Sequence, residues 1–179
     1  MEVMIKLMEQ DGVLTPHLAI ATEAEGVFMI TKQILTDTDK LHFLLDEMAK
    51  EAELYLLPDL VMQHLQFPGI AVPNLLNNPP ENFDGKDVYV LKNTCNLYGA
   101  SLILNKKLMK NIGKLMKKDF YIIPSSIHEV LLMPVTEDVD VEFVKQMVHD
   151  VNMTLNQKDI LSYNIFLCYK ETGEFECLN

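Results

Sequence analysis

Two short apolar runs on either side of a polar corner dominate the hydrophobic pattern in the second half of the chain. Residues 120–123 are β-forming, and Pro124 ends that run because proline lacks the backbone donor that a sheet needs. Residues 130–133 resume the apolar run. The pattern predicts two strands joined by a polar connection.

The first half of the chain shows a similar order of elements. Strands are predicted at four places: residues 2–8, 18–21, 27–31 and 54–57. Apolar positions at helical spacing predict a helix over residues 38–53, capped by Thr36 or Thr38. Residues 60–65 fit either a strand or a helical turn, so the last element of this half stays open.

A segment of different composition separates the two halves. Residues 67–86 contain four of the eight prolines, which predicts a linker. Beyond it, strands are predicted at six places: residues 88–91, 100–104, 120–123, 130–133, 163–169 and 174–178. Helices are predicted over residues 106–118 and over residues 139–153, the second capped by Asp138 or Asp140.

The two halves repeat one unit: hairpin, helix, strand, proline corner, strand. Residues 54–58 match residues 120–124, including a shared Tyr-x-x-Pro. The sequence therefore predicts an α+β fold of two similar ββαββ lobes, with antiparallel sheets each covered by a helix, plus a C-terminal helix and β-hairpin. The lobes are residues 1–66 and residues 87–179, joined by the linker.

Composition limits the classes of protein that fit this fold. The chain has 179 residues, 49% hydrophobic and 23% charged, as in globular domains. No apolar run approaches the roughly 20 residues of a membrane span, and residues 1–8 lack the features of a secretory signal. Cys95, Cys168 and Cys177 form neither a disulfide framework nor a zinc pattern. We expect a cytoplasmic protein without a membrane partner.

The charge of the chain argues against nucleic acid as a partner. The formal net charge is −11, and all fifteen basic residues are lysine. Arginine, the usual bidentate ligand of phosphate and guanine, is absent. Because an acidic protein repels a polyanion, we expect no nucleic-acid binding.

Ser125, Ser126 and His128 in the polar corner are the weak candidates for catalysis. A hydrolase would need a serine Oγ within reach of the imidazole, a third group that orients it, and an oxyanion hole. The chain has no Gly-x-Ser-x-Gly motif, and no acid can be assigned to the third role. Serines after a proline more often satisfy the backbone groups of a turn, and the sequence favours that interpretation.

No metal or cofactor site is predicted. The five histidines do not pair with one another or with cysteines at ligand spacing: His17, His42, His64, His128 and His149. The acidic group Glu137, Asp138, Asp140 and Glu142 lacks the glycine and spacing of a calcium loop, so it fits a charged helix start better.

Lysines on the predicted helix over residues 106–118 form a possible interaction face. Its members recur at helical spacing: Lys106, Lys110, Lys114 and Lys117, with Lys107 and Lys118 beside them. A solvated face is one interpretation. In another, the face meets an acidic surface in the other half or on a second subunit, and the predicted helix over residues 38–53 carries acidic charge. Anionic membrane or nucleic acid is opposed by the net charge.

The second half resembles an uncharacterised bacterial family, domain of unknown function 5688. The longest stretch that carries the likeness is Asp119-Phe120-Tyr121-Ile122-Ile123-Pro124-Ser125-Ser126-Ile127-His128-Glu129-Val130. The others are residues 89–93, 98–100, 147–152 and 169–173, and residues 18–20 and 28–31 look like the family's middle section. The resemblance implies an intracellular bacterial protein and brings no activity. Longer members have a further N-terminal region, which implies a short member or a truncated chain.

The expected function follows mainly from what the sequence lacks. Without a catalytic constellation, cofactor loop or metal pattern, we expect a non-enzymatic protein-interaction or self-association module whose sheet faces or edges accept a protein partner. The alternative is a small-molecule-binding sensor with a pocket between sheet and helix, its ligand unknown. An enzyme of hydrolase type is the third hypothesis.

Overall fold

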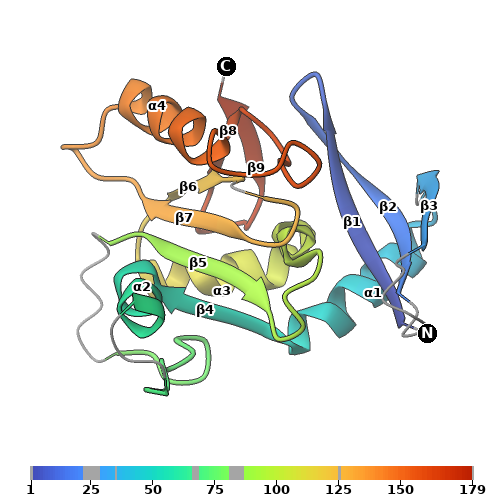
Figure 1. The fold of residues 1–179 in the computed structure, drawn as a ribbon, viewed down its shortest axis with the longest axis horizontal. Helices are drawn as coiled ribbons and strands as arrows, with labels where there is room; N and C mark the ends of the chain where they lie inside the picture. Colours follow the sequence, from blue (N-terminus) through green and yellow to red (C-terminus); the bar gives the residue numbers. More distant parts are fainter. Residues whose placement is uncertain are drawn as a thin grey trace.

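The first three strands form a separate sheet. The computed structural model describes residues 2–21, 29–34, 36–65, 69–80, 87–124 and 126–178. Strands β1 (Glu2–Gln10), β2 (Val13–Ala21) and β3 (Met29–Ile34) are antiparallel in the order β1-β2-β3. Asp11 and Gly12 make the β1–β2 turn with positive φ angles of 53° and 78°. This sheet lies beside the larger one (Figure 1).

The larger sheet is six-stranded and antiparallel, in the order β4-β5-β7-β6-β8-β9. Its strands are β4 (Ala52–Leu56), β5 (Tyr89–Asn93), β6 (Phe120–Ile123), β7 (Val130–Pro134), β8 (Ile165–Cys168) and β9 (Phe175–Leu178). Strand β4 comes from the first half of the chain, whereas the other five come from the second half. The two halves therefore share a sheet.

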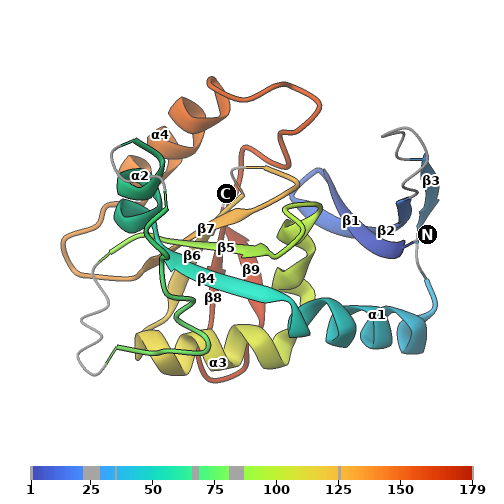
Figure 2. The ribbon, with the colours of Figure 1, turned by 60° about the horizontal axis from the view of Figure 1, so that its bottom comes forward.

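Helices cover both faces of the six-stranded sheet. They are α1 (Thr38–Lys50), α2 (Leu57–Leu65), α3 (Lys106–Met116), α4 (Val141–Asn152) and the 3₁₀ helix η2 (Gly99–Leu104). Figure 2 shows α3 under one face of the sheet and α2 and α4 over the other. Because both faces are buried, the central strands are apolar at nearly every position instead of alternating with polar residues.

Successive side chains of the central strands pack into two different hydrophobic clusters. In β6, Phe120 and Ile122 enter the cluster that contains the buried side chains of α3, α1 and β1. Tyr121 and Ile123 point the other way, into the cluster that holds Val144 and Val148 of α4. The period of two along each strand thus fastens helices to both sides of the sheet.

The α+β class, the antiparallel sheets, the helices and the C-terminal hairpin are confirmed, and the two-lobe order is present in outline. Strands β6 and β7 flank the polar corner as predicted, and Asp140 caps α4 by accepting the N–H of Glu142 at 3.1 Å. Parts of the predicted strand over residues 27–31 and of the linker over residues 67–86 lie outside the described residues.

Three predicted elements need correction. The strand expected over residues 100–104 is the 3₁₀ helix η2, because a short run that is buried on all sides carries no period to distinguish the two. Helix α1 ends at Lys50, and its cap is Asp37, whose carboxylate accepts the N–H of Lys40 at 3.0 Å, in place of Thr36 or Thr38. The open element over residues 60–65 belongs to helix α2, with Pro58 in its first turn.

The outer edge of β4 is closed by the segment that follows α2. The Asn74 side chain accepts the N–H of Leu54 at 3.0 Å and donates to the carbonyl of Ala52 at 3.1 Å. The N–H of Leu75 reaches the carbonyl of Leu54 at 2.8 Å. These bonds satisfy backbone groups that an exposed edge strand would offer to another chain.

Candidate functional site

The lysine face predicted from the sequence forms the outer side of helix α3. The opposite side of α3 buries Leu108, Met109, Ile112 and Met116, and the helix contains no acidic residue. Lys106 pairs with Glu174 at 2.7 Å and Lys107 pairs with Asp46 at 3.3 Å. The first two lysines thus already bind carboxylates of the same chain, one of them on α1, as the charge pattern suggested.

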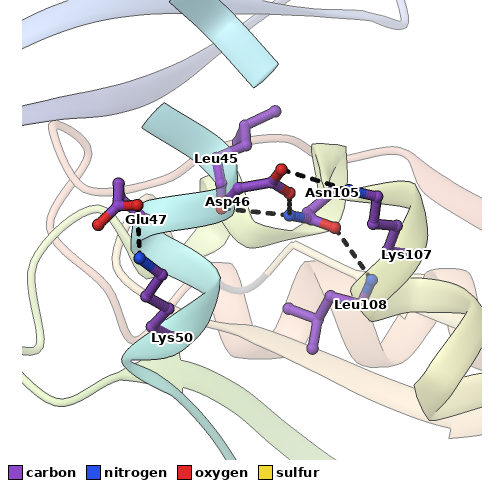
Figure 3. Close-up of polar contacts among 7 residues, drawn as sticks. All are labelled: Leu45, Asp46, Glu47, Lys50, Asn105, Lys107 and Leu108. Carbon is purple, nitrogen blue, oxygen red and sulfur yellow. Dashed lines mark hydrogen bonds and ion pairs between the residues drawn. The ribbon is translucent and has the colours of Figure 1, made fainter. Parts of the chain in front are cut away.

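Asn105 fixes the start of α3 against α1 (Figure 3). Its Oδ1 accepts the N–H of Leu108 at 3.0 Å, which caps the helix. Its Nδ2 donates to the carbonyl of Leu45 at 3.2 Å and to the carboxylate of Asp46 at 3.0 Å. The bond from Asn105, followed by that from Lys107, holds the pKa of Asp46 below its usual value.

A charged cleft opens where strands β7, β6 and β8 end side by side. Phe120 pairs with Pro134 on one side and with Cys168 on the other, so the residues beyond these positions surround the start of β6. The cleft has a volume of about 840 Å³. It is lined by Lys117, Lys118, Asp119, Val135, Thr136, Glu137, Asp138 and Lys170.

The strand order puts Glu137 and Asp138 on the β7 side of this cleft and Lys170 on its β8 side, so we describe the lining as an acidic wall and a basic wall. Lys117 and Lys118 follow α3 and form the basic wall together with Lys170 of the β8–β9 turn, whose Nζ donates to the carbonyl of Lys117 at 3.2 Å. Asp119 is held at the base by the backbone N–H of Lys170 at 2.9 Å. Glu137 and Asp138, exposed in the β7–α4 connection, form the acidic wall.

The predicted catalytic group lies at a second place, the corner between β6 and β7. The Oγ of Ser126 accepts the backbone N–H of His128 at 3.0 Å and that of Glu129 at 3.2 Å. These bonds are those of a serine turn, and both use the oxygen that a nucleophile would need. Ser125 lies outside the described residues. The geometry fits the structural interpretation of this serine.

His128 joins three segments of the chain. Its Nδ1 accepts the backbone N–H of Tyr98 at 3.3 Å, and its Nε2 lies 3.8 Å from the carboxylate of Asp159. The imidazole stacks on the Tyr98 ring with centroids 5.7 Å apart. Tyr98 has the unusual φ of 54°, and a Cβ on Gly99 would lie 2.5 Å from the carbonyl of His128. This tightly packed corner fixes the loop before η2.

The sequence did not identify the apolar outer surface of helix α2. Val61, Met62 and Leu65 are 45%, 44% and 76% exposed, and none of the residues of α2 is buried. Ile70, which is 57% exposed, shares with Met62 a hollow of about 180 Å³. We call these four residues the α2 patch. The i, i+1, i+4 spacing on a helix was the signal that could have revealed it.

A metal site would need a group of ligating side chains, and a membrane span would need a long apolar helix. Across the described ranges, no three His, Cys, Asp or Glu side chains are grouped in a way that could hold a metal ion. Within the same ranges, no helix is long and apolar enough to cross a membrane.

The comparisons with known proteins give a family but no activity. No curated protein and no solved structure matches the chain. The profile of a family described as "Family of unknown function (DUF5688)" matches residues 16–170. This match covers all the described helices and strands except β1, the first three residues of β2, and β9. The resemblance seen in the second half therefore extends through most of the first, and the chain belongs to the family of unknown function DUF5688.

Proposed function

We propose that the protein is a non-enzymatic interaction module that binds another protein through the α2 patch. The observation that carries this proposal is the position of Val61, Met62 and Leu65 on the outer side of a helix whose inner residues, Leu57 and Leu60, pack on the sheet. A nine-residue helix is marginal alone, so the sheet holds it in place. Contiguous exposed apolar residues on a folded domain are typical of a contact surface.

The shape of the patch supports a partner that offers an apolar side chain. The hollow between α2 and the following segment is lined by Met62 and by residues 70–73, with Asp59 and Gln63 also lining it. The Gln63 side chain donates to the carbonyl of Ile70 and so fixes one side of the hollow. An apolar hollow with polar neighbours can receive one anchoring residue, and the flexible thioether of Met62 adapts to its shape.

The proposal includes a cytoplasmic setting, which the cysteines support. Cys95 is exposed and Cys168 is buried, and no disulfide joins cysteines within the described ranges. Such thiols suit a reducing compartment. The strongly acidic chain also makes nucleic acid and anionic membranes unfavourable partners.

The test is native mass spectrometry of the tagged protein, purified gently from cells that produce it naturally. The wild type is compared with L65E, which places a charge in the patch, and with M153E as the matched control. Leu65 and Met153 are exposed to 76% and 71%, so both changes add one carboxylate at a similarly exposed apolar site. We expect one protein partner to bind the wild type and M153E and to be absent from L65E.

Two results would contradict the proposal. A partner that remains on L65E would show that binding uses another surface. An added mass of a few hundred daltons on all three proteins, without a protein partner, would support the small-molecule sensor in place of the interaction module.

A further inference from the structure

The charged cleft combines two features that single out one occupant. Its lining contains three lysines, Lys117, Lys118 and Lys170, and three carboxylates, on Asp119, Glu137 and Asp138, so its formal charge is zero. The chain as a whole carries −11. A second copy of so acidic a protein is repelled over most of the surface but not at this place.

Three exposed charges of the two walls have no ion-pair partner among the described residues. Lys117 on the basic wall and Glu137 and Asp138 on the acidic wall enter no ion pair with any described residue. The two lysines at the other end of α3, Lys106 and Lys107, show that this helix face does bind carboxylates when they are within reach. These three side chains are therefore available to pair with opposite charges on a partner.

A two-fold axis through the cleft would use both walls at once. In a two-fold contact the same surface appears on both subunits, so every match between the copies occurs twice. Rotation by half a turn places the basic wall of each copy opposite the acidic wall of the other. We propose that the charged cleft is a self-association surface at which a second copy of the chain docks, basic wall against acidic wall.

Other partners fit the cleft less well. A uniformly acidic peptide, a phosphate group or an anionic lipid would gain from the lysines but would be repelled by Glu137 and Asp138 on the facing wall. A basic partner would gain from Glu137 and Asp138 but would be repelled by the lysines. A second copy satisfies both walls, and this inference uses a surface other than the α2 patch, so the failure of one proposal leaves the other intact.

The dimer is expected to be weak. Exposed ion pairs contribute little each, and the cleft is lined by eight residues, far fewer than the roughly 20–30 residues per side of a standard interface. A dissociation constant on the order of 100 µM is therefore the expected scale. Sedimentation velocity from about 10 to 500 µM protein, in buffer with about 150 mM NaCl, covers that range.

Charge exchange between the walls gives the decisive test. The variant K117E/K118E makes both walls acidic, and the variant E137K/D138K makes both walls basic. Each alone is expected to be monomeric, with its dissociation constant raised at least tenfold, because like charges then face one another. An equimolar mixture of the two is expected to form a heterodimer, since a predominantly acidic cleft, which keeps Lys170, then meets a predominantly basic one, which keeps Asp119. The control K40E/K158E has the same change in net charge as K117E/K118E, but at exposed lysines away from the cleft. It is expected to dimerise like the wild type.

Thermal unfolding of every variant checks that the fold is kept. The proposal is overturned by a wild type that stays monomeric up to 500 µM, by K117E/K118E that still dimerises, or by a mixture in which both folded variants remain monomers. Restored association in the mixture supports it, because lost stability in either variant cannot be repaired by adding the other.

Discussion

Replacing Asn105 by alanine is expected to lower the free energy of unfolding by about 2 kcal/mol. Asn105 is 6% exposed and uses both ends of its amide. The oxygen caps α3 through Leu108, and the nitrogen donates to the carbonyl of Leu45 in α1. Alanine removes both functions at the junction shown in Figure 3.

The magnitude comes from two separable contributions. Loss of an N-cap costs about 1 kcal/mol. Loss of a buried hydrogen bond to a neutral carbonyl, here that of Leu45, costs about 1 kcal/mol more. In a chain of 179 residues this corresponds to a melting temperature about 4–8 °C lower. The bond to Asp46 adds little to this value because that carboxylate is exposed to solvent.

Equilibrium urea unfolding of three variants separates the two contributions. N105S keeps an oxygen for the cap but cannot span to α1, so it should lose about half as much stability as N105A. N111A makes the same change on the exposed side of the same helix and should lose none, since alanine is the better helix former. The reasoning fails if N105A stays within about 0.5 kcal/mol of the wild type, or if N105S is as damaging as N105A.

The pH dependence of Asp46 tests the same junction independently. Because the folded-state pKa of Asp46 is lowered, first by Asn105 and then by Lys107, its contribution to stability is present above the unfolded value near pH 4. That contribution is lost as the pH falls toward the folded pKa. Carboxyl titration by NMR should show a depressed pKa in the wild type that moves back up in N105A. An unchanged titration would contradict the assigned bond.

Three further predictions follow from contacts elsewhere. G113A should destabilise the protein by about 1–3 kcal/mol in urea unfolding, against the usual gain from alanine in a helix, because its Cβ would lie 2.6 Å from the Cα of Lys170. N74A should cost about 2 kcal/mol and promote aggregation, measured by urea unfolding and light scattering, because it opens the edge of β4. Burial raises the pKa of Cys168 to about 12, so a thiol reagent at pH 8 should modify Cys95 rapidly and Cys168 only on unfolding; rapid modification of both would contradict its burial.

The elements that the sequence predicted well are those with a clear period and a clear end. Helix α3 has apolar residues on one side and lysines on the other, and β6 ends at a proline. The sequence contained a signal that could have predicted helix α2. Pro58 and Asp59 suit the first turn of a helix as well as they suit the end of a strand. The 3₁₀ helix η2 carried none, since Gly99 to Ile103 are all buried.

The candidate sites also divide into those that the sequence could predict and those that it could not. The lysines of α3 could be predicted because helical spacing alone places them on one face. The acidic wall could not, because Glu137 reaches the end of α3 only through the pairing of Phe120 with Pro134, and strand register is decided by tertiary contacts. The corner at His128 likewise depends on Tyr98, about thirty residues away, being held at a positive φ.

The two predicted lobes share a sheet, and this affects whether they can unfold separately. All five residues of β4 pair with β5, and the main hydrophobic cluster combines Ile5 and Leu45 from the first half with Leu91 and Ile112 from the second. Separating the halves would break a strand pair and expose both sides of that cluster at once. Unfolding one half while the other stays folded would therefore cost much free energy. We therefore expect one cooperative transition in urea, with hydrogen exchange in β1, α1 and β6 reporting the same free energy of opening. Exchange in β1 and α1 at a free energy several kcal/mol below that of β6 would show that the first half unfolds independently, and the shared core would then not couple the lobes.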